Sequence, residues 1–182
     1  KTYVTFVVVD GATNFLWAYP QKTKNSTETI ETLREWIETF QCSPKSMVAD
    51  MAFDNPEFEA FFKEYNIRPM LTGSHTPWPN RAEAANRLFK RYLAAYRDEI
   101  NKDPRLRTLS PKSLIRRAAT ARNTTVAFGG KIPLELAMGR RPRDVVTIEH
   151  EGMDSLTSPL IPEQSDVARV QKIAMKAYLE AR

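Results

Sequence analysis

Residues 2–20, TYVTFVVVDGATNFLWAYP, predict a β-hairpin at the start of the chain. The first half of this stretch is an almost unbroken run of β-branched and aromatic residues, which favours a strand buried on both faces. The turn-forming residues GAT follow, and NFLWAYP has the composition of a partner strand. The hairpin would place Asp10 at the end of its first strand.

The elements expected after the hairpin alternate between helix and strand. Residues 25–40 carry cap candidates, acids in the first turn and apolar residues at helical spacing. Residues 55–66 place four aromatic side chains at helical spacing on a second helix, which Asn66 is expected to end. Short apolar runs at 45–50 and 67–71 predict strands beside these helices. This order favours an α/β fold in which a mixed sheet is flanked by helices.

Helices are expected to dominate the second half of the chain. Residues 83–101 and 110–125 each have an apolar stripe at helical spacing, and residues 129–144 enclose a short helix between Gly and Pro breaks. We expect a core over residues 1–144, then a linker and a C-terminal helix over residues 145–182. The helical pattern is still open at the last residue, which suggests a piece of a longer protein.

Composition limits the functional classes. The chain has 182 residues, 27% of them charged, and lacks the run of about 20 apolar residues that a membrane-spanning helix needs. Its start does not have the features of a signal peptide. Cys42 has no second cysteine to pair with, so a reducing intracellular location is expected. The net charge of +5 and the pI of about 9.4 are modest support for a polyanionic partner.

Three acidic residues stand where predicted strands end or a predicted helix begins. Asp10 and Asp50 close strands, and Glu83 opens the helix of residues 83–101. A charge at the end of a buried strand is costly unless a metal or another group compensates it. Converging carboxylates suit Mg²⁺, and two such ions can hold the attacking and leaving oxygens of a phosphodiester. Turn capping and the helix dipole explain the same positions without a metal.

The helix that Glu83 opens carries basic residues on the same face. Arg87 and Lys90 follow Glu83 at spacings of four and three, while Tyr92 and Tyr96 turn to the core. An acid that binds metal beside cations that bind phosphates is what a nucleic-acid phosphoryl-transfer site requires. The alternative is an ordinary surface ion pair between Glu83 and Arg87, which stabilises a helix by only a few tenths of a kcal/mol.

Four blocks follow one another over residues 2–144: FVVVDGATNFLWAYP, MVAD followed by PEFEAFFKEYNI, HTPWPNRAEAANRLFK, and ARNTTVAFGGKIPLELAMGRRPR. In this order they resemble the catalytic cores of retroviral and long-terminal-repeat retrotransposon integrases. The resemblance implies an RNase H-like fold and a carboxylate triad that binds two Mg²⁺ or Mn²⁺ ions. It also implies a dimer or higher oligomer of cores that acts on element ends and target DNA in the nucleus.

The resemblance assigns roles to individual residues. Asp50 matches the second acid of the triad and Glu83 the third, so these two are the implied metal ligands. Arg87 and Lys90 match helix positions that contact DNA. Other cations are candidates for the same role: Arg81 and Arg91 beside these positions, and Arg140 and Arg141 in a later basic cluster. Three arginines on the later helix are expected to face either DNA or water: Arg116, Arg117 and Arg122.

The match departs from the family in two places. The first acid of the triad is expected upstream of Lys1, so the core would lack its first strand. Asp10 matches instead an acid found at the hairpin end in many retrotransposon members, and it is a catalytic candidate on that basis. Asp50 and Glu83 enclose 32 residues, fewer than is usual. The usual spacing would put Asn86 at the third position, although the helix register favours Glu83.

Three functions remain open from the sequence. The first is an integrase core that uses metal ions to hydrolyse phosphodiester bonds and to join DNA strands during retroelement integration. The second is an inactive integrase-derived fragment that acts in DNA binding or dimerisation, which the expected absence of the first acid favours. The third is another RNase H-like nuclease, which leaves the tail PLELAMGRRPR unexplained.

Overall fold

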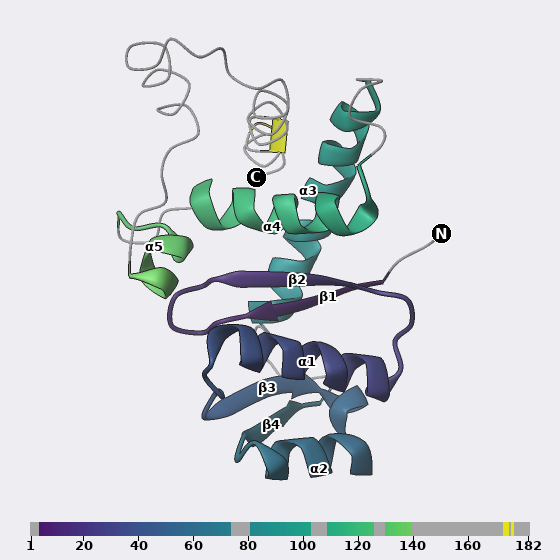
Figure 1. Cartoon of the computed structure of the whole chain (residues 1–182), viewed down its shortest axis with the longest axis vertical. Helices are drawn as coiled ribbons and strands as arrows, with labels where there is room; N and C mark the ends of the chain where they lie inside the picture. Colours follow the sequence, from purple (N-terminus) through teal and green to yellow (C-terminus); the bar gives the residue numbers. More distant parts are fainter. Residues whose placement is uncertain are drawn as a thin grey trace. The chain divides into compact units, whose positions relative to one another are not determined.

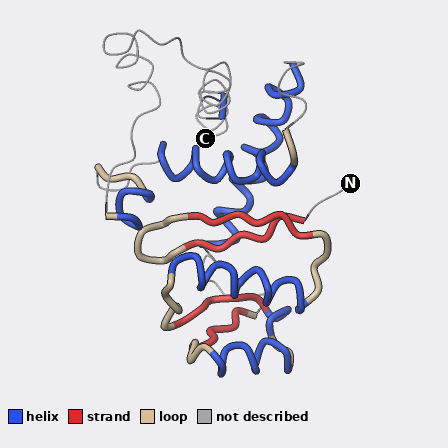
Figure 2. Tube along the Cα trace, viewed as in Figure 1, coloured by secondary structure: helices blue, strands red, loops and turns tan. Residues whose placement is uncertain are grey.

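The computed structural model describes residues 4–73, 81–102, 109–125, 130–139, 173, 174 and 176 (Figure 1). Its elements in chain order are β1 (Val4–Val9), β2 (Leu16–Gln21), α1 (Ser26–Phe40), β3 (Ser46–Asp50), the 3₁₀ turn η1 (Met51–Phe53), α2 (Pro56–Glu64), β4 (Arg68–Thr72), α3 (Arg81–Lys102), α4 (Pro111–Thr125) and α5 (Pro133–Met138). After the two strands β1 and β2, helices and strands alternate up to β4, and helices follow (Figure 2).

The chain divides into two compact units. The first unit comprises Lys1–Phe6 and Tyr19–Ala84, and the second comprises Val7–Ala18 and Ala85–Arg182. The α/β class that the sequence predicts is confirmed, with the strands arranged in two two-stranded sheets, β1–β2 and β3–β4, within the described ranges. No helix in the described part of the chain combines the length and the apolar character needed to cross a bilayer.

The predicted hairpin is formed by β1 and β2. Asn14 adopts a left-handed conformation with φ of 60° in the turn, and the Asp10 N–H donates to the Phe15 carbonyl at 2.9 Å. Strand β1 is half-buried along its whole length, so the expected burial on both faces is wrong. Val7 and Val9 pack against buried residues of the second unit, but β2 is the one strand paired with β1 among the described residues, so the other edge of β1 stays partly accessible.

Helix α1 starts and stops at caps that the sequence signals. The Asn25 side chain accepts a hydrogen bond from the Glu28 N–H at 2.9 Å, and Gln41 ends the helix in a left-handed conformation. Leu33 and Ile37 are buried, as the helical spacing predicts.

The loop between β2 and α1 is held by the carboxylate of Glu28. It accepts hydrogen bonds from the Lys22 N–H at 2.7 Å, the Thr23 N–H at 2.8 Å and the Thr23 hydroxyl at 2.6 Å. The Thr23 hydroxyl and then the Lys22 N–H hold the pKa of Glu28 below its usual value.

Elements β3, α2 and β4 form a strand–helix–strand unit. The two strands are parallel, with Ser46 opposite Arg68 and Asp50 opposite Thr72, and a helical crossover is the usual way to join parallel strands. The Asn55 side chain caps α2 by accepting from the Phe58 N–H at 3.1 Å. Three aromatic residues of α2 are buried in the first unit: Phe58, Phe61 and Phe62.

The second unit is built around α3 and α4. Its buried cluster comprises Leu16, Ala18, Phe89, Tyr92, Tyr96, Ile100, Ile115, Ala118, Ala119, Ala121 and Ala174. The rings of Tyr92 and Tyr96 stack with centroids 5.9 Å apart. Burial raises the pKa of Tyr96 to about 12, so its hydroxyl stays protonated at neutral pH.

The predicted boundary between core and tail lies outside the described residues. The linker expected from residue 145 falls within residues 140–172, and most of the expected C-terminal helix is also undescribed. Ile173, Ala174 and Lys176 are helical, which agrees with the helical pattern at that point.

Candidate functional site

Asp50 closes β3 and also caps the turn that follows. It is the N-cap of η1, and its Oδ1 accepts a hydrogen bond from the Ala52 N–H at 3.0 Å. The residue is exposed, and its Oδ2 makes no hydrogen bond within the described residues. One carboxylate oxygen of Asp50 is therefore available to a ligand while the other holds the backbone.

Glu83 lies in the first turn of α3, where the helix dipole favours an acid. Its side chain is exposed. The alternative ion pair with Arg87 is not formed: neither Glu83 nor Arg87 makes an ion pair or side-chain hydrogen bond to any residue in the described ranges. Glu83 and Arg87, one helical turn apart, are therefore both exposed and do not neutralise each other.

Asp10 is engaged in its own turn. Its Oδ2 accepts hydrogen bonds from the Thr13 N–H at 2.8 Å and from the Thr13 hydroxyl at 2.5 Å, and the residue is half-buried. This geometry is that of an aspartate that stabilises a turn through its side chain. A catalytic role for Asp10 stays a prediction, and it would have to use the carboxylate oxygen that Thr13 does not hold.

The candidate acids are divided between the two units. Asp50 and Glu83 belong to the first unit, and Asp10 belongs to the second. Across the described ranges, no three His, Cys, Asp or Glu side chains come together as a metal site. The free carboxylate oxygens of Asp50 and Glu83 are nevertheless the donor type that a hard divalent cation prefers.

Helix α3 presents a basic face to solvent. Arg87, Lys90, Arg91 and Arg97 are all exposed, and their spacing keeps them away from the buried stripe of the same helix. Exposed cations on one helix face are the arrangement that binds phosphates. Of the other predicted DNA contacts, the side chain of Arg81 and both Arg140 and Arg141 lie outside what the structure describes.

Arg122 does not face DNA or water, and that expectation is wrong. Its side chain is only 6% exposed, and it donates to the Asn14 carbonyl at 2.7 Å and to the Asn14 Oδ1 at 3.3 Å. The next residue, Asn123, is 2% exposed and binds both backbone groups of Leu16: it accepts from the N–H at 2.9 Å and donates to the carbonyl at 2.8 Å. Helix α4 therefore holds the hairpin turn that contains Asp10.

This contact was missed because arginine and asparagine are usually exposed. A signal was present in the sequence, because Ile115, Ala118, Ala119 and Arg122 follow the spacing of one buried helix face. Of the other two arginines on α4, Arg116 is exposed as expected, and Arg117 is half-buried with its Nε donating to the Ser113 hydroxyl at 3.2 Å.

No protein-family model matches the chain. A curated protein of similar sequence is the Pro-Pol polyprotein of feline foamy virus, which is 37% identical over 90 residues. The match covers 48% of this chain and 8% of the polyprotein, so the chain corresponds to a small part of that relative.

Solved structures with a similar fold include integrase cores. The catalytic core domain of HTLV-2 integrase, in complex with magnesium and in dimeric form, matches with a TM-score of 0.58 at 20% identity, over 76% of this chain and 85% of that one. The BIV integrase core domain matches with a TM-score of 0.58 at 16% identity, over 84% and 91% of the two chains. A chain of the simian T-cell lymphotropic virus intasome in complex with PP2A regulatory subunit B56 gamma gives a TM-score of 0.59 at 18% identity, over 79% and 54%. The predicted RNase H-like fold class is confirmed by these matches.

Proposed function

We propose that this chain, which has the fold of the retroviral integrase catalytic cores, is the DNA-processing core of a retroelement integrase. The proposed reaction is metal-dependent hydrolysis of a phosphodiester bond near a DNA end, followed by transfer of the new 3′ hydroxyl onto target DNA. The observation that supports it is the exposed Glu83 beside an exposed Arg87 with which it forms no ion pair.

In this proposal Asp50 and Glu83 hold a Mg²⁺ or Mn²⁺ ion through their free carboxylate oxygens. A bound divalent ion activates the attacking oxygen and stabilises charge on the leaving oxygen. Asp50 keeps one oxygen on the Ala52 N–H, which fixes the orientation of its carboxylate. The full reaction would need a second ion and ligands beyond these two carboxylates.

The basic face of α3 would bind the DNA backbone. Arg87, Lys90 and Arg91 stand on the helix that begins with Glu83, so phosphates held by these cations would lie along the same helix as the acid. The proposed partners are retroelement DNA ends and target DNA, and the proposed state is a homodimer or higher oligomer working in the nucleus. The HTLV-2 integrase core has been solved in dimeric and trimeric forms, which supports the oligomer.

A Mn²⁺ titration by calorimetry tests the metal assignment. Asp50→Asn and Glu83→Gln should each weaken binding by more than the roughly 10–100-fold that the loss of an outer-shell partner causes. Each variant should also lack the strand-transfer activity that the parent chain shows on a labelled DNA duplex. Asp98→Asn is the matched control, because Asp98 is an exposed acid further along α3. Binding that survives in both Asp50→Asn and Glu83→Gln would contradict the assignment.

The basic face of α3 predicts a salt-dependent interaction with DNA. Arg87→Ala and Lys90→Ala should each lower the affinity for duplexes of any sequence, and each lost phosphate contact should reduce the slope of log affinity against log salt by about 1. Fluorescence anisotropy at several salt concentrations measures both quantities. Lys24→Ala removes the same charge from an exposed loop position and serves as the control. Unchanged binding in both α3 variants would rule out this face as the DNA site.

The second candidate function is DNA binding or dimerisation without catalysis. The contacts of Asp10 favour it, since one oxygen of this carboxylate is already committed to Thr13. The two candidates give different results in the same experiments: an inactive core binds DNA through α3, but neither Asp50→Asn nor Glu83→Gln changes its response to Mn²⁺.

A further inference from the structure

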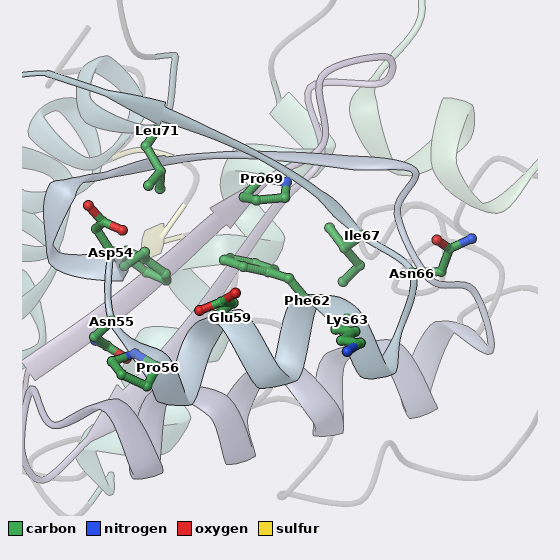
Figure 3. A pocket seen from close by; sticks show the side chains of 11 residues that line it. Asp54, Asn55, Pro56, Glu59, Phe62, Lys63, Asn66, Ile67, Pro69 and Leu71 are labelled. Atoms are coloured by element: carbon green, nitrogen blue, oxygen red, sulfur yellow. The ribbon is translucent and has the colours of Figure 1, made fainter.

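A groove of about 550 Å³ lies between α2 and β4, and all of its lining residues belong to the first unit (Figure 3). Its floor is apolar and consists of Phe53, Phe62, Ile67, Pro69 and Leu71. Phe62 and Ile67 are buried at 5% and 4% exposure, so the floor is anchored in the core of the unit. The volume falls within the range of roughly 300–1,000 Å³ that is usual for ligand sites.

Three charged side chains lie along the margin of this apolar floor. Asp54 precedes α2, while Glu59 and Lys63 stand one helical turn apart on it. Figure 3 shows the Glu59 carboxylate near the Phe62 ring and the Asp54 carboxylate on the side of Leu71. All three charged side chains are exposed, and none has an ion pair or hydrogen bond with another described residue. The groove therefore has two carboxylates toward one end and an ammonium group toward the other.

The preference of acids for helix N-termini explains part of this pattern. It explains Glu57 equally well, and Glu57 does not line the groove. The distinguishing feature is that two carboxylates share one apolar groove although the chain has a net charge of +5. Such a groove repels the phosphates of nucleic acid and attracts a cationic group that carries apolar surface.

We propose that the groove between α2 and β4 binds a short extended peptide segment of a partner protein, in which an apolar side chain lies between a basic and an acidic residue. The apolar side chain would cover Phe62 and Leu71. The basic residue would meet Asp54 and Glu59, and the acidic residue would meet Lys63. This site differs in chemistry from the basic face of α3, because it combines an apolar floor and two carboxylates with a single ammonium group.

Two fluorescein-labelled hexapeptides test the proposal by polarisation with the whole chain. Both contain a central Leu-Phe pair followed by two glutamates; the first begins with Arg-Lys and the second begins with Glu-Glu. The affinity of the first peptide should be at least about tenfold higher than that of the second. Glu59→Lys should reverse this preference, and Leu71→Ala should weaken binding of the first peptide by about tenfold through lost apolar contact.

Glu57→Lys is the matched control, because it makes the same charge change on an exposed position of α2 outside the groove. It should leave the affinity for the first peptide unchanged, and circular dichroism checks that both lysine variants keep their helix content. Three outcomes overturn the proposal: the parent chain binds neither peptide, it does not distinguish them, or Glu57→Lys and Glu59→Lys weaken binding equally. None of these outcomes bears on the Mn²⁺ titration, so the peptide site and the proposed catalytic function fail independently.

Discussion

Asn123→Ala should lower the free energy of unfolding by about 2–4 kcal/mol. The Asn123 amide satisfies both the N–H and the carbonyl of Leu16, at 2.9 Å and 2.8 Å, and Leu16 is fully buried. Removing the amide leaves two buried backbone groups without partners, and each such group costs roughly 1–3 kcal/mol. The Asn123 Oδ1 also accepts from Arg122 at 3.2 Å, so a third donor loses a contact.

Urea denaturation followed by circular dichroism measures this loss. Thr120→Ala, at an exposed position of the same helix, is the control. If the loss in Asn123→Ala comes from buried backbone groups left without partners, Thr120→Ala should change the free energy of unfolding by about 0.5 kcal/mol or less. An Asn123→Ala variant as stable as Thr120→Ala would mean that water replaces the amide at Leu16. Of the α4 contacts to the hairpin, those of Arg122 with Asn14 would then remain as the ones that hold it.

Phe61→Ala should destabilise the first unit by about 3–5 kcal/mol. Phe61 is 2% exposed, and its ring lies 5.7 Å from that of Phe62 and 5.0 Å from that of Tyr65, measured between centroids. Truncation to alanine removes the ring and leaves a cavity that rigid neighbours fill only in part.

Phe61→Leu separates the cavity effect from the loss of a particular aromatic contact. Leucine keeps much of the apolar volume, so this variant should lose clearly less stability than alanine when the two are compared by urea denaturation. Equal losses in the two variants would show that the ring contacts, rather than the filled volume, hold α2 in place.

Much of the fold could be predicted from the sequence because it depends on local interactions. Asn25 marks the start of its helix because an amide oxygen next to a helix start satisfies free backbone N–H groups, and Asn55 caps α2 in the same way. Spacing alone placed Leu33, Tyr92 and Tyr96 in the core. The ends of α1, α2 and β3 lie at or within a residue or two of the positions that the patterns predict.

The candidate site was predicted only in part. The sequence placed Asp50 at a strand end and Glu83 at a helix start, and both positions are confirmed by the structure. It could not decide whether Glu83 pairs with Arg87, because a spacing of four permits an ion pair and does not require one. Turn capping was left open as an alternative for Asp10, and the structure shows that its carboxylate accepts from the Thr13 N–H and hydroxyl.

The sequence by itself determined the order and limits of the elements, the apolar face of each helix and the acids at their ends, because neighbours along the chain control these features. Only the tertiary structure decided that Arg122 and Asn123 are buried against the hairpin turn, 107 or 108 residues away in sequence. It alone brought Asp54, Glu59 and Leu71 into one groove. The physical reason is the same in both cases: burial and charge pairing depend on which distant segments meet, and local sequence patterns do not encode those meetings.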